Sequence, residues 1–127
     1  MTRAELIEAL ETAQGVDRGL FIAAFDCCHP APCGAVGGPV PDAYYAWLRV
    51  KDRFCHLLNT DAYLDAAMML VPEGCTWSAG DWSAIAKGAS ATCWPPEDRR
   101  PPNYNGICHA ATPALALAAA CLRAGGE

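Results

Sequence analysis

The chain has 127 residues, of which 53% are hydrophobic and 18% are charged, and this balance predicts one globular domain over residues 1–127. Nine basic residues against 14 acidic residues give a net charge of −5, which argues against general nucleic-acid binding and against adsorption to anionic membranes. No apolar run is long enough to span a bilayer, and the first residues lack the apolar core of a signal peptide. We therefore expect a cytoplasmic protein.

Two helices are predicted in the first part of the chain. Thr2 and Glu5 have the spacing of a capping box at the start of the first helix, and Gly15 ends that helix. Asp17 is placed to cap the second helix. Residues 29–42 are rich in proline and glycine, which weaken both helices and strands, so we expect a long loop insertion there.

The middle of the chain is predicted to form the sheet, because aromatic and β-branched residues favour strands. The segments with this character are 44–50, 54–58, 75–78, 83–87 and 89–94. Between the second and third of them a helix is expected, capped by Asn59 or Thr60 and ended by Pro72. The predicted buried face of that helix consists of Leu64, Ala67, Met68 and Val71. Prolines and charges predict an irregular loop over residues 95–106.

The last predicted helix is apolar on every side. Thr112 is its cap, Pro113 occupies the first helical position and Gly125 ends it. A helix of this kind must be covered all round, so we expect a homo-oligomer with this helix, or the helix near residues 60–71, at the interface. Together the elements predict an α+β fold, an antiparallel sheet of four to five strands with helices packed on it.

The chain contains eight cysteines, and each of its three histidines follows one of them. Without a secretory signal we expect reduced thiols that act as small hydrophobic side chains. The irregular spacing argues against a structural metal, so neither a metal nor another cofactor is predicted. If a metal were bound, the ligands to test would be the tightest cluster, Cys27, Cys28, His29 and Cys33.

The sequence has no recognisable catalytic motif. Asp26, Cys28, His29 and Cys33 are close together, but no nucleophile elbow, phosphate-binding loop or dinucleotide-binding glycine pattern occurs. We therefore predict that the protein is not an enzyme.

Aromatic residues and arginines suggest a ligand-binding site. Aromatic rings stack on bases, and arginine holds phosphate through two parallel hydrogen bonds. The predicted site consists of Trp94, Arg99, Arg100 and Tyr104, and a second patch consists of Tyr45, Trp47 and Arg49. The alternative is that the tryptophans are half-buried sheet residues and that the arginines are solvated.

Two segments are similar to a known family. Residues 59–77, NTDAYLDAAMMLVPEGCTW, resemble the T-x-S-L-D-A-A-L-x-L-V-P-E-G-W-x-W segment of the phage ABA-sandwich domain family, and residues 110–124 resemble its A-A-T-P-A-L-A-L-C-A-A-A-L-K-A ending. Residues 2–18 are similar to its first helix, whereas Cys75 replaces a usual tryptophan and residues 29–53 have no counterpart. The resemblance implies helix–sheet–helix layers and a phage or prophage product.

Three functions are compatible with these features. The resemblance and the aromatic–arginine site favour a phage-encoded, non-enzymatic sponge, a protein that sequesters a small nucleotide-like immune signal of the host as an anti-defence measure. The alternative is a protein–protein inhibitor or adaptor of a host or phage partner. An enzyme that acts on a nucleotide is the third. The expected partners are therefore a small nucleotide-like ligand and further copies of the chain, with no nucleic acid and no membrane.

Overall fold

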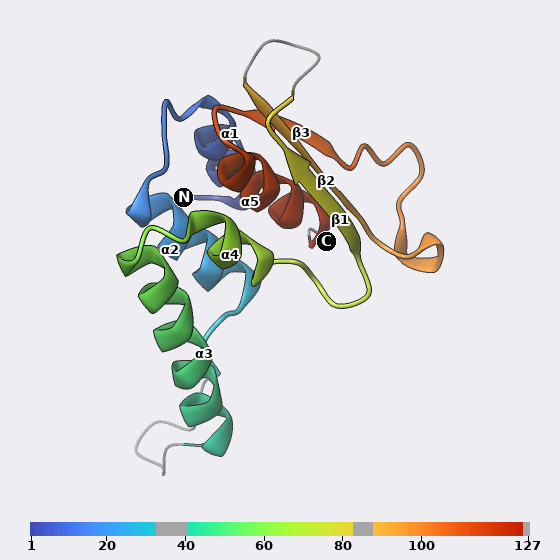
Figure 1. Ribbon diagram of the computed structural model, residues 1–127. Helices are drawn as coiled ribbons and strands as arrows, with labels where there is room; N and C mark the ends of the chain where they lie inside the picture. The colour runs from blue at the N-terminus through green and yellow to red at the C-terminus, as the bar shows by residue number, and fades with distance from the viewer. Residues whose placement is uncertain (33–40, 83–87, 126–127) are drawn as a thin grey trace.

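The computed structural model describes residues 1–32, 41–82 and 88–125. The order of its elements is α1 (Arg3–Thr12), α2 (Arg18–Cys28), α3 (Asp42–Asn59), α4 (Tyr63–Met68), β1 (Thr76–Gly80), β2 (Ala89–Trp94), the short 3-10 helix η1 (Glu97–Arg99), β3 (Ile107–Ala110) and α5 (Pro113–Ala124). Figure 1 shows a mixed α+β architecture in which the sheet lies on one side and the helices on the other. None of the helices in the described residues is long and apolar enough to cross a membrane.

Side-chain caps begin three of the helices. The Thr2 hydroxyl accepts a hydrogen bond from the Glu5 amide, and the Glu5 carboxylate accepts one from the Thr2 amide, so the predicted capping box is confirmed. Asp17 caps α2 by accepting from the Leu20 amide. The Thr112 hydroxyl caps α5 in the same way, with Pro113 as the first helical residue. These caps satisfy amides that the helices themselves leave unpaired.

The sheet has three antiparallel strands in the order β1-β2-β3. The prediction of four to five strands therefore exceeds what the described residues form, and the expected strand over residues 83–87 lies outside them. β3 was not predicted, because it has only four residues and follows a segment rich in proline and asparagine. Cys93 lies opposite Trp77, and Ala91 lies opposite Cys108. Because strand side chains alternate, this register turns the small residues of β2 toward the helices.

Residues 44–50 and 54–58 are helical, so the two strands predicted there are wrong. They form a single 18-residue helix, α3. Phe54 and Leu58 are buried four residues apart, and Trp47, seven residues before Phe54, is half-buried. This is helical spacing. The local aromatic and β-branched composition favours strands, but the burial of one helix face outweighs that preference.

The helix α4 begins later than predicted. Because α3 continues to Asn59, Thr60 ends that helix, and its hydroxyl donates to the His56 carbonyl, while Ala62 precedes α4 as its cap. The buried face is also different from the predicted one. Leu64 and Met68 are 41% and 42% exposed, and the buried residues of this region are Ala66, Ala67 and Leu70.

The last helix, α5, lies at the centre of the protein. It contacts all three strands on one side and α1, α2 and α4 on the other, and every residue from Ala114 to Leu122 is buried. The chain thus covers its own apolar helix, so the expectation that α5 needs a subunit interface is wrong. Within the described ranges no helix packs on the opposite face of the sheet (Figure 1), so the implied helix–sheet–helix order is not observed.

The two leucines Leu117 and Leu64 test this arrangement. Leu117 is fully buried in α5, whereas Leu64 is 41% exposed on α4. We expect Leu117→Ala to lower the free energy of unfolding by about 2–5 kcal/mol because it leaves a cavity. The control, Leu64→Ala, should cost about 0.5 kcal/mol. Urea denaturation measures both, and equal losses would contradict the assignment of the two faces.

Candidate functional site

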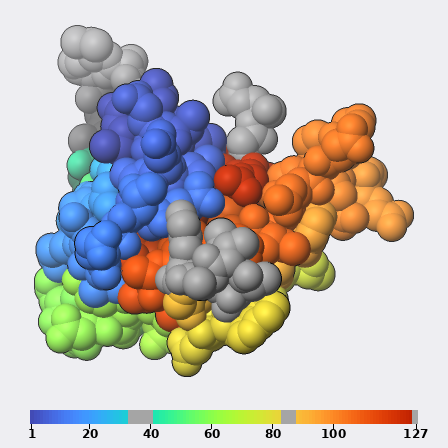
Figure 2. Space-filling view, turned by 90° about the horizontal axis from the view of Figure 1, so that it is seen from above, coloured from blue at the N-terminus to red at the C-terminus, as the bar shows by residue number. Residues whose placement is uncertain are grey.

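The structure brings together three of the four residues of the first predicted site. Trp94 ends β2, and the segment that follows it projects from the body of the protein before it returns to β3 (Figure 2). The Tyr104 ring meets the Trp94 ring edge-on, with centroids 5.6 Å apart. The guanidinium carbon of Arg100 lies 5.2 Å from the centroid of the Trp94 ring, a cation–π contact. We call these three residues the Trp94 corner.

The polar groups of Arg100 and Tyr104 are already bonded to backbone carbonyls. Arg100 donates from Nε and Nη2 to the Pro95 oxygen at 3.2 and 2.8 Å. The Tyr104 hydroxyl donates to the Cys93 oxygen at 3.0 Å, and burial raises the pKa of Tyr104 to about 12. Arg100 covers the Trp94 ring on one side, and a Cβ on Gly106 would lie within 2.7–2.8 Å of that ring. A base that stacked on Trp94 would therefore have to displace Arg100.

Arg99 does not join this corner. Its Nη2 donates to the carbonyl of Glu73, 2.7 Å away, in the segment that leads into β1. The same Nη2 atom would lie only 2.8 Å from a Cβ atom built on Gly74. Through this hydrogen bond, Arg99 connects η1 with the segment that precedes β1.

The helical geometry of α3 splits the second predicted patch. Trp47 faces α2, and its indole nitrogen donates to the carbonyl of His29 at 2.6 Å. Its ring lies 6.3 Å from that of Phe25. Tyr45, 51% exposed, and Arg49 are four residues apart on a different side of α3. Two of the three predicted residues thus share one exposed face.

The same face carries a residue that was not predicted. Arg53 is exposed and lies one further turn along α3, so Tyr45, Arg49 and Arg53 follow each other at four-residue intervals of about 6 Å. We call these three residues the α3 stripe. Interpreting residues 44–50 and 54–58 as strands put Tyr45, Trp47 and Arg49 on one face and left Arg53 in the turn between the strands. In the helix, Arg53 instead shares the face of Tyr45 and Arg49, and Trp47 lies on another.

Among the basic residues that the structure describes, Arg49 and Arg53 differ from the others because neither has a hydrogen bond or an ion pair. The remaining described cations are bonded: Arg3 to the Leu122 carbonyl, Arg18 to Asn59, Lys51 to Asp26, Arg99 to the Glu73 carbonyl, Arg100 to the Pro95 carbonyl, and Arg123 to the Ile107 carbonyl and Glu11. Within the part of the chain that the structure describes, the unpaired lysine and arginine side chains therefore lie on α3.

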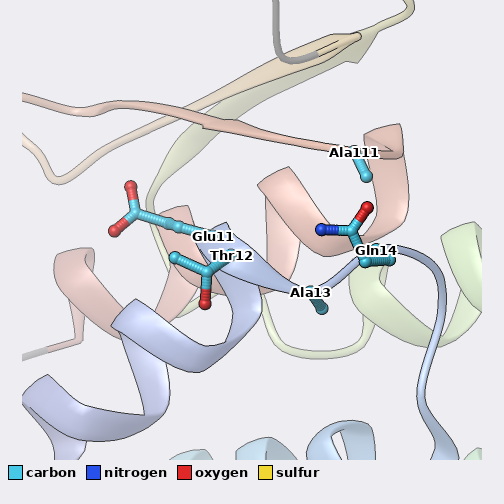
Figure 3. A pocket seen from close by; sticks show the side chains of 5 residues that line it. All are labelled: Glu11, Thr12, Ala13, Gln14 and Ala111. Atoms are coloured by element: carbon cyan, nitrogen blue, oxygen red, sulfur yellow. The ribbon is translucent and has the colours of Figure 1, made fainter.

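The cavities that described residues line include the following three. One of about 340 Å³ lies where α1 meets the turn before α5 (Figure 3), and its lining residues are Glu11, Thr12, Ala13, Gln14 and Ala111. It offers neither an aromatic ring nor a cation. A second, of about 330 Å³, lies between α3 and α4, with Arg53, Leu57, Asp65, Met68 and Met69 around it. One end of the α3 stripe thus opens into a partly apolar hollow.

The third cavity, of about 180 Å³, is lined in part by Cys28 and His29. Burial raises the pKa of the Cys28 thiol to about 11, and His29 bonds through Nε2 to the carbonyl of Met69 at 2.9 Å. Neither observation indicates an activated nucleophile. Cys33 lies outside the described residues, and within them no group of three histidines, cysteines or carboxylates is placed to hold a metal ion.

Comparisons with known proteins find no matching family model, curated protein or solved structure. The resemblance to the phage ABA-sandwich domain family, with the phage origin that it implies, therefore stays a prediction.

A substitution at Gly106 tests the packing of the Trp94 corner. A methyl group there would lie 2.7 Å from the Trp94 ring and 2.8 Å from the Cys93 oxygen, so Gly106→Ala should lower the free energy of unfolding by about 1–3 kcal/mol. In the control, Gly80→Ala, the new methyl group has nothing within 4 Å, and we expect no loss. Thermal unfolding measures both. Unchanged stability of Gly106→Ala would show that Trp94 does not pack there.

Proposed function

We propose that this chain is a non-enzymatic binding protein that sequesters a small nucleotide-like ligand on the α3 stripe. The observation that carries the proposal is that Arg49 and Arg53, unpaired among the described residues, share an exposed helix face with Tyr45. The proposal keeps the predicted class of ligand but moves the site from Trp94 to α3. The anti-defence role belongs to the same proposal and rests on the family resemblance alone.

Phosphate binding favours the α3 stripe over the Trp94 corner. A guanidinium that already donates to a carbonyl must break that hydrogen bond before it can hold a phosphate, whereas Arg49 and Arg53 have none to break. Tyr45 offers an exposed ring on which a base can stack. The spacing of about 6 Å per helical turn suits a ligand with a base at one end and phosphates at the other.

The hollow between α3 and α4 supplies the remaining contacts. Leu57 and Met68 contribute apolar surface next to Arg53. Asp65 lies in the same lining, and its carboxylate repels phosphate. The sign of the charges thus favours phosphate toward Arg49 and away from Asp65.

Alanine variants of the arginines test the site. With a panel of fluorescent nucleoside mono-, di- and triphosphates and cyclic dinucleotides as probes, Arg49→Ala and Arg53→Ala should each weaken binding by about tenfold or more, because each removes a charged hydrogen bond. The matched control, Arg100→Ala, should bind as the wild type does. Fluorescence titration measures all three.

Two results would overturn this proposal. The first is a loss of binding in Arg100→Ala with unchanged binding in Arg49→Ala, which would place the site at the Trp94 corner. The second is that no probe binds the wild type. Where a probe does bind, heat denaturation of the complex separates binding from catalysis, because a sponge releases the nucleotide intact and an enzyme releases a product.

Self-association remains part of the proposal, with α4 as the interface. α5 is covered by its own chain, but Leu64 and Met68 leave an exposed apolar surface on α4, beside the cavity that Arg53 and Asp65 border. A two-fold axis there would place Leu64 and Met68 of each copy against those of the other, so that exposed apolar surface covers exposed apolar surface.

A charged side chain on α4 tests the interface. We expect the wild type to sediment as a dimer at micromolar concentration and Met68→Glu to sediment as a monomer, since a buried unpaired carboxylate opposes association. The melting temperature of the variant monomer should stay near that of the wild type, because Met68 is 42% exposed. A monomeric wild type would contradict self-association and favour the adaptor alternative, in which a different protein covers Leu64 and Met68.

A further inference from the structure

Three cysteine side chains form a row between the sheet and α5. Cys93 lies on β2 and Cys121 on α5, both fully buried. Cys75 directly precedes β1, and the pairing of Trp77 with Cys93 puts Cys75 on the same face of the sheet, diagonally across from Cys93. We call these three residues the thiol row.

Hydrogen bonds connect the thiol row with Cys93 at its centre. The thiols of Cys121 and Cys75 both donate to the sulfur of Cys93, and these bonds lower the pKa of Cys93 despite its burial. The bond to Cys93 and burial raise the pKa of Cys121, and burial is the main cause that raises the pKa of Cys75. Within the row, Cys93 is therefore the thiol whose ionised form is best stabilised.

Solvent reaches the thiol row at one end, at Cys75. Cys93 and Cys121 have no exposed surface, whereas Cys75 is half-buried. The positive charge of Arg99, which is bonded to the neighbouring Glu73 carbonyl, partly offsets the effect of burial on the pKa of Cys75. A reagent in solution therefore meets Cys75 first, with Cys93 directly behind it.

We propose that the thiol row is a redox site in which a small disulfide, such as oxidised glutathione, converts Cys75 and Cys93 into a disulfide. The Cys75 thiolate attacks one sulfur of glutathione disulfide, forms a mixed disulfide and releases one glutathione thiolate, which takes up the Cys75 proton. The Cys93 thiolate then attacks the Cys75 sulfur, and the second glutathione leaves with the Cys93 proton. Two protein thiols lose two electrons, and one glutathione disulfide gains them.

The reaction joins two neighbouring positions on one face of the sheet. Cys75 and Cys93 lie at the same end of the β1–β2 ladder, diagonally across from each other. Cys75 lies just outside β1, and the segment before β1 must shift to bring the two sulfurs within bonding distance. The disulfide would link β2 covalently to the residue before β1 at that end of the ladder. Cys121 would lose its acceptor but remain buried as a neutral thiol among apolar neighbours.

Peptide mapping of the full-length protein tests the proposal. Reduced protein is incubated with oxidised glutathione at about pH 8, where thiolates begin to form, and the remaining thiols are alkylated in acid before trypsin digestion. Cleavage after Arg53, Lys87 and Arg99 separates the two cysteines. We expect peptides 54–87 and 88–99 to be joined, with a mass lower by two hydrogens than their sum.

Variants identify the bond and keep the test decisive. Because peptide 54–87 also contains Cys55, Cys55→Ser is the matched control and should retain the cross-link. Cys75→Ser and Cys93→Ala should each abolish it, and Cys93→Ala keeps a small apolar side chain in the core. Circular dichroism verifies that both variants are folded.

Three outcomes would overturn the proposal. One is a cross-link that persists in Cys75→Ser. Another is a cross-link between peptides 88–99 and 100–123, which would join Cys93 to Cys108 or Cys121 instead. The third is glutathione attached to Cys75 without any subsequent cross-link, which would show that Cys93 cannot reach its neighbour.

Discussion

Burial of the central residues of α5 determines how the other helices and the sheet are arranged. All residues from Ala114 to Leu122 are buried, and such a helix is stable in water only when other elements cover every side of it. The sheet covers one side, and α1, α2 and α4 cover the other. Its many alanines present little side-chain volume, so the neighbouring elements can approach closely.

The packing around α5 determines which arginine side chains form hydrogen bonds within the protein and which do not. The sheet uses its inner face on α5, and the segment after β2 closes over Trp94 with Arg100 bonded to the Pro95 carbonyl. Arg3 likewise bonds the Leu122 carbonyl near the end of α5. In contrast, α3 buries only Phe54 and Leu58. Its outer face is left to solvent, and for this reason the free guanidiniums lie there.

Some of the small residues that let the sheet approach α5 are cysteines, so the core also contains thiol groups. Cys93 and Cys108 alternate with polar positions along β2 and β3, and Cys121 faces them from α5. Sulfur is apolar enough to fill these positions and still able to form hydrogen bonds. Packing by cysteine in place of alanine therefore brings several thiols into contact without any metal-binding spacing in the sequence.

Features that depend only on neighbouring residues could be predicted from the sequence. The caps at Thr2, Asp17 and Thr112 are local hydrogen bonds, and the apolar run of α5 requires burial in any fold, so both could be predicted. Tertiary structure decided the rest. It made α3 a helix because Phe54 and Leu58 had to face the core together, and it separated Arg99 from Arg100 by offering them different carbonyls. Which cations stay unpaired depends on contacts between distant segments, and local sequence does not contain that information.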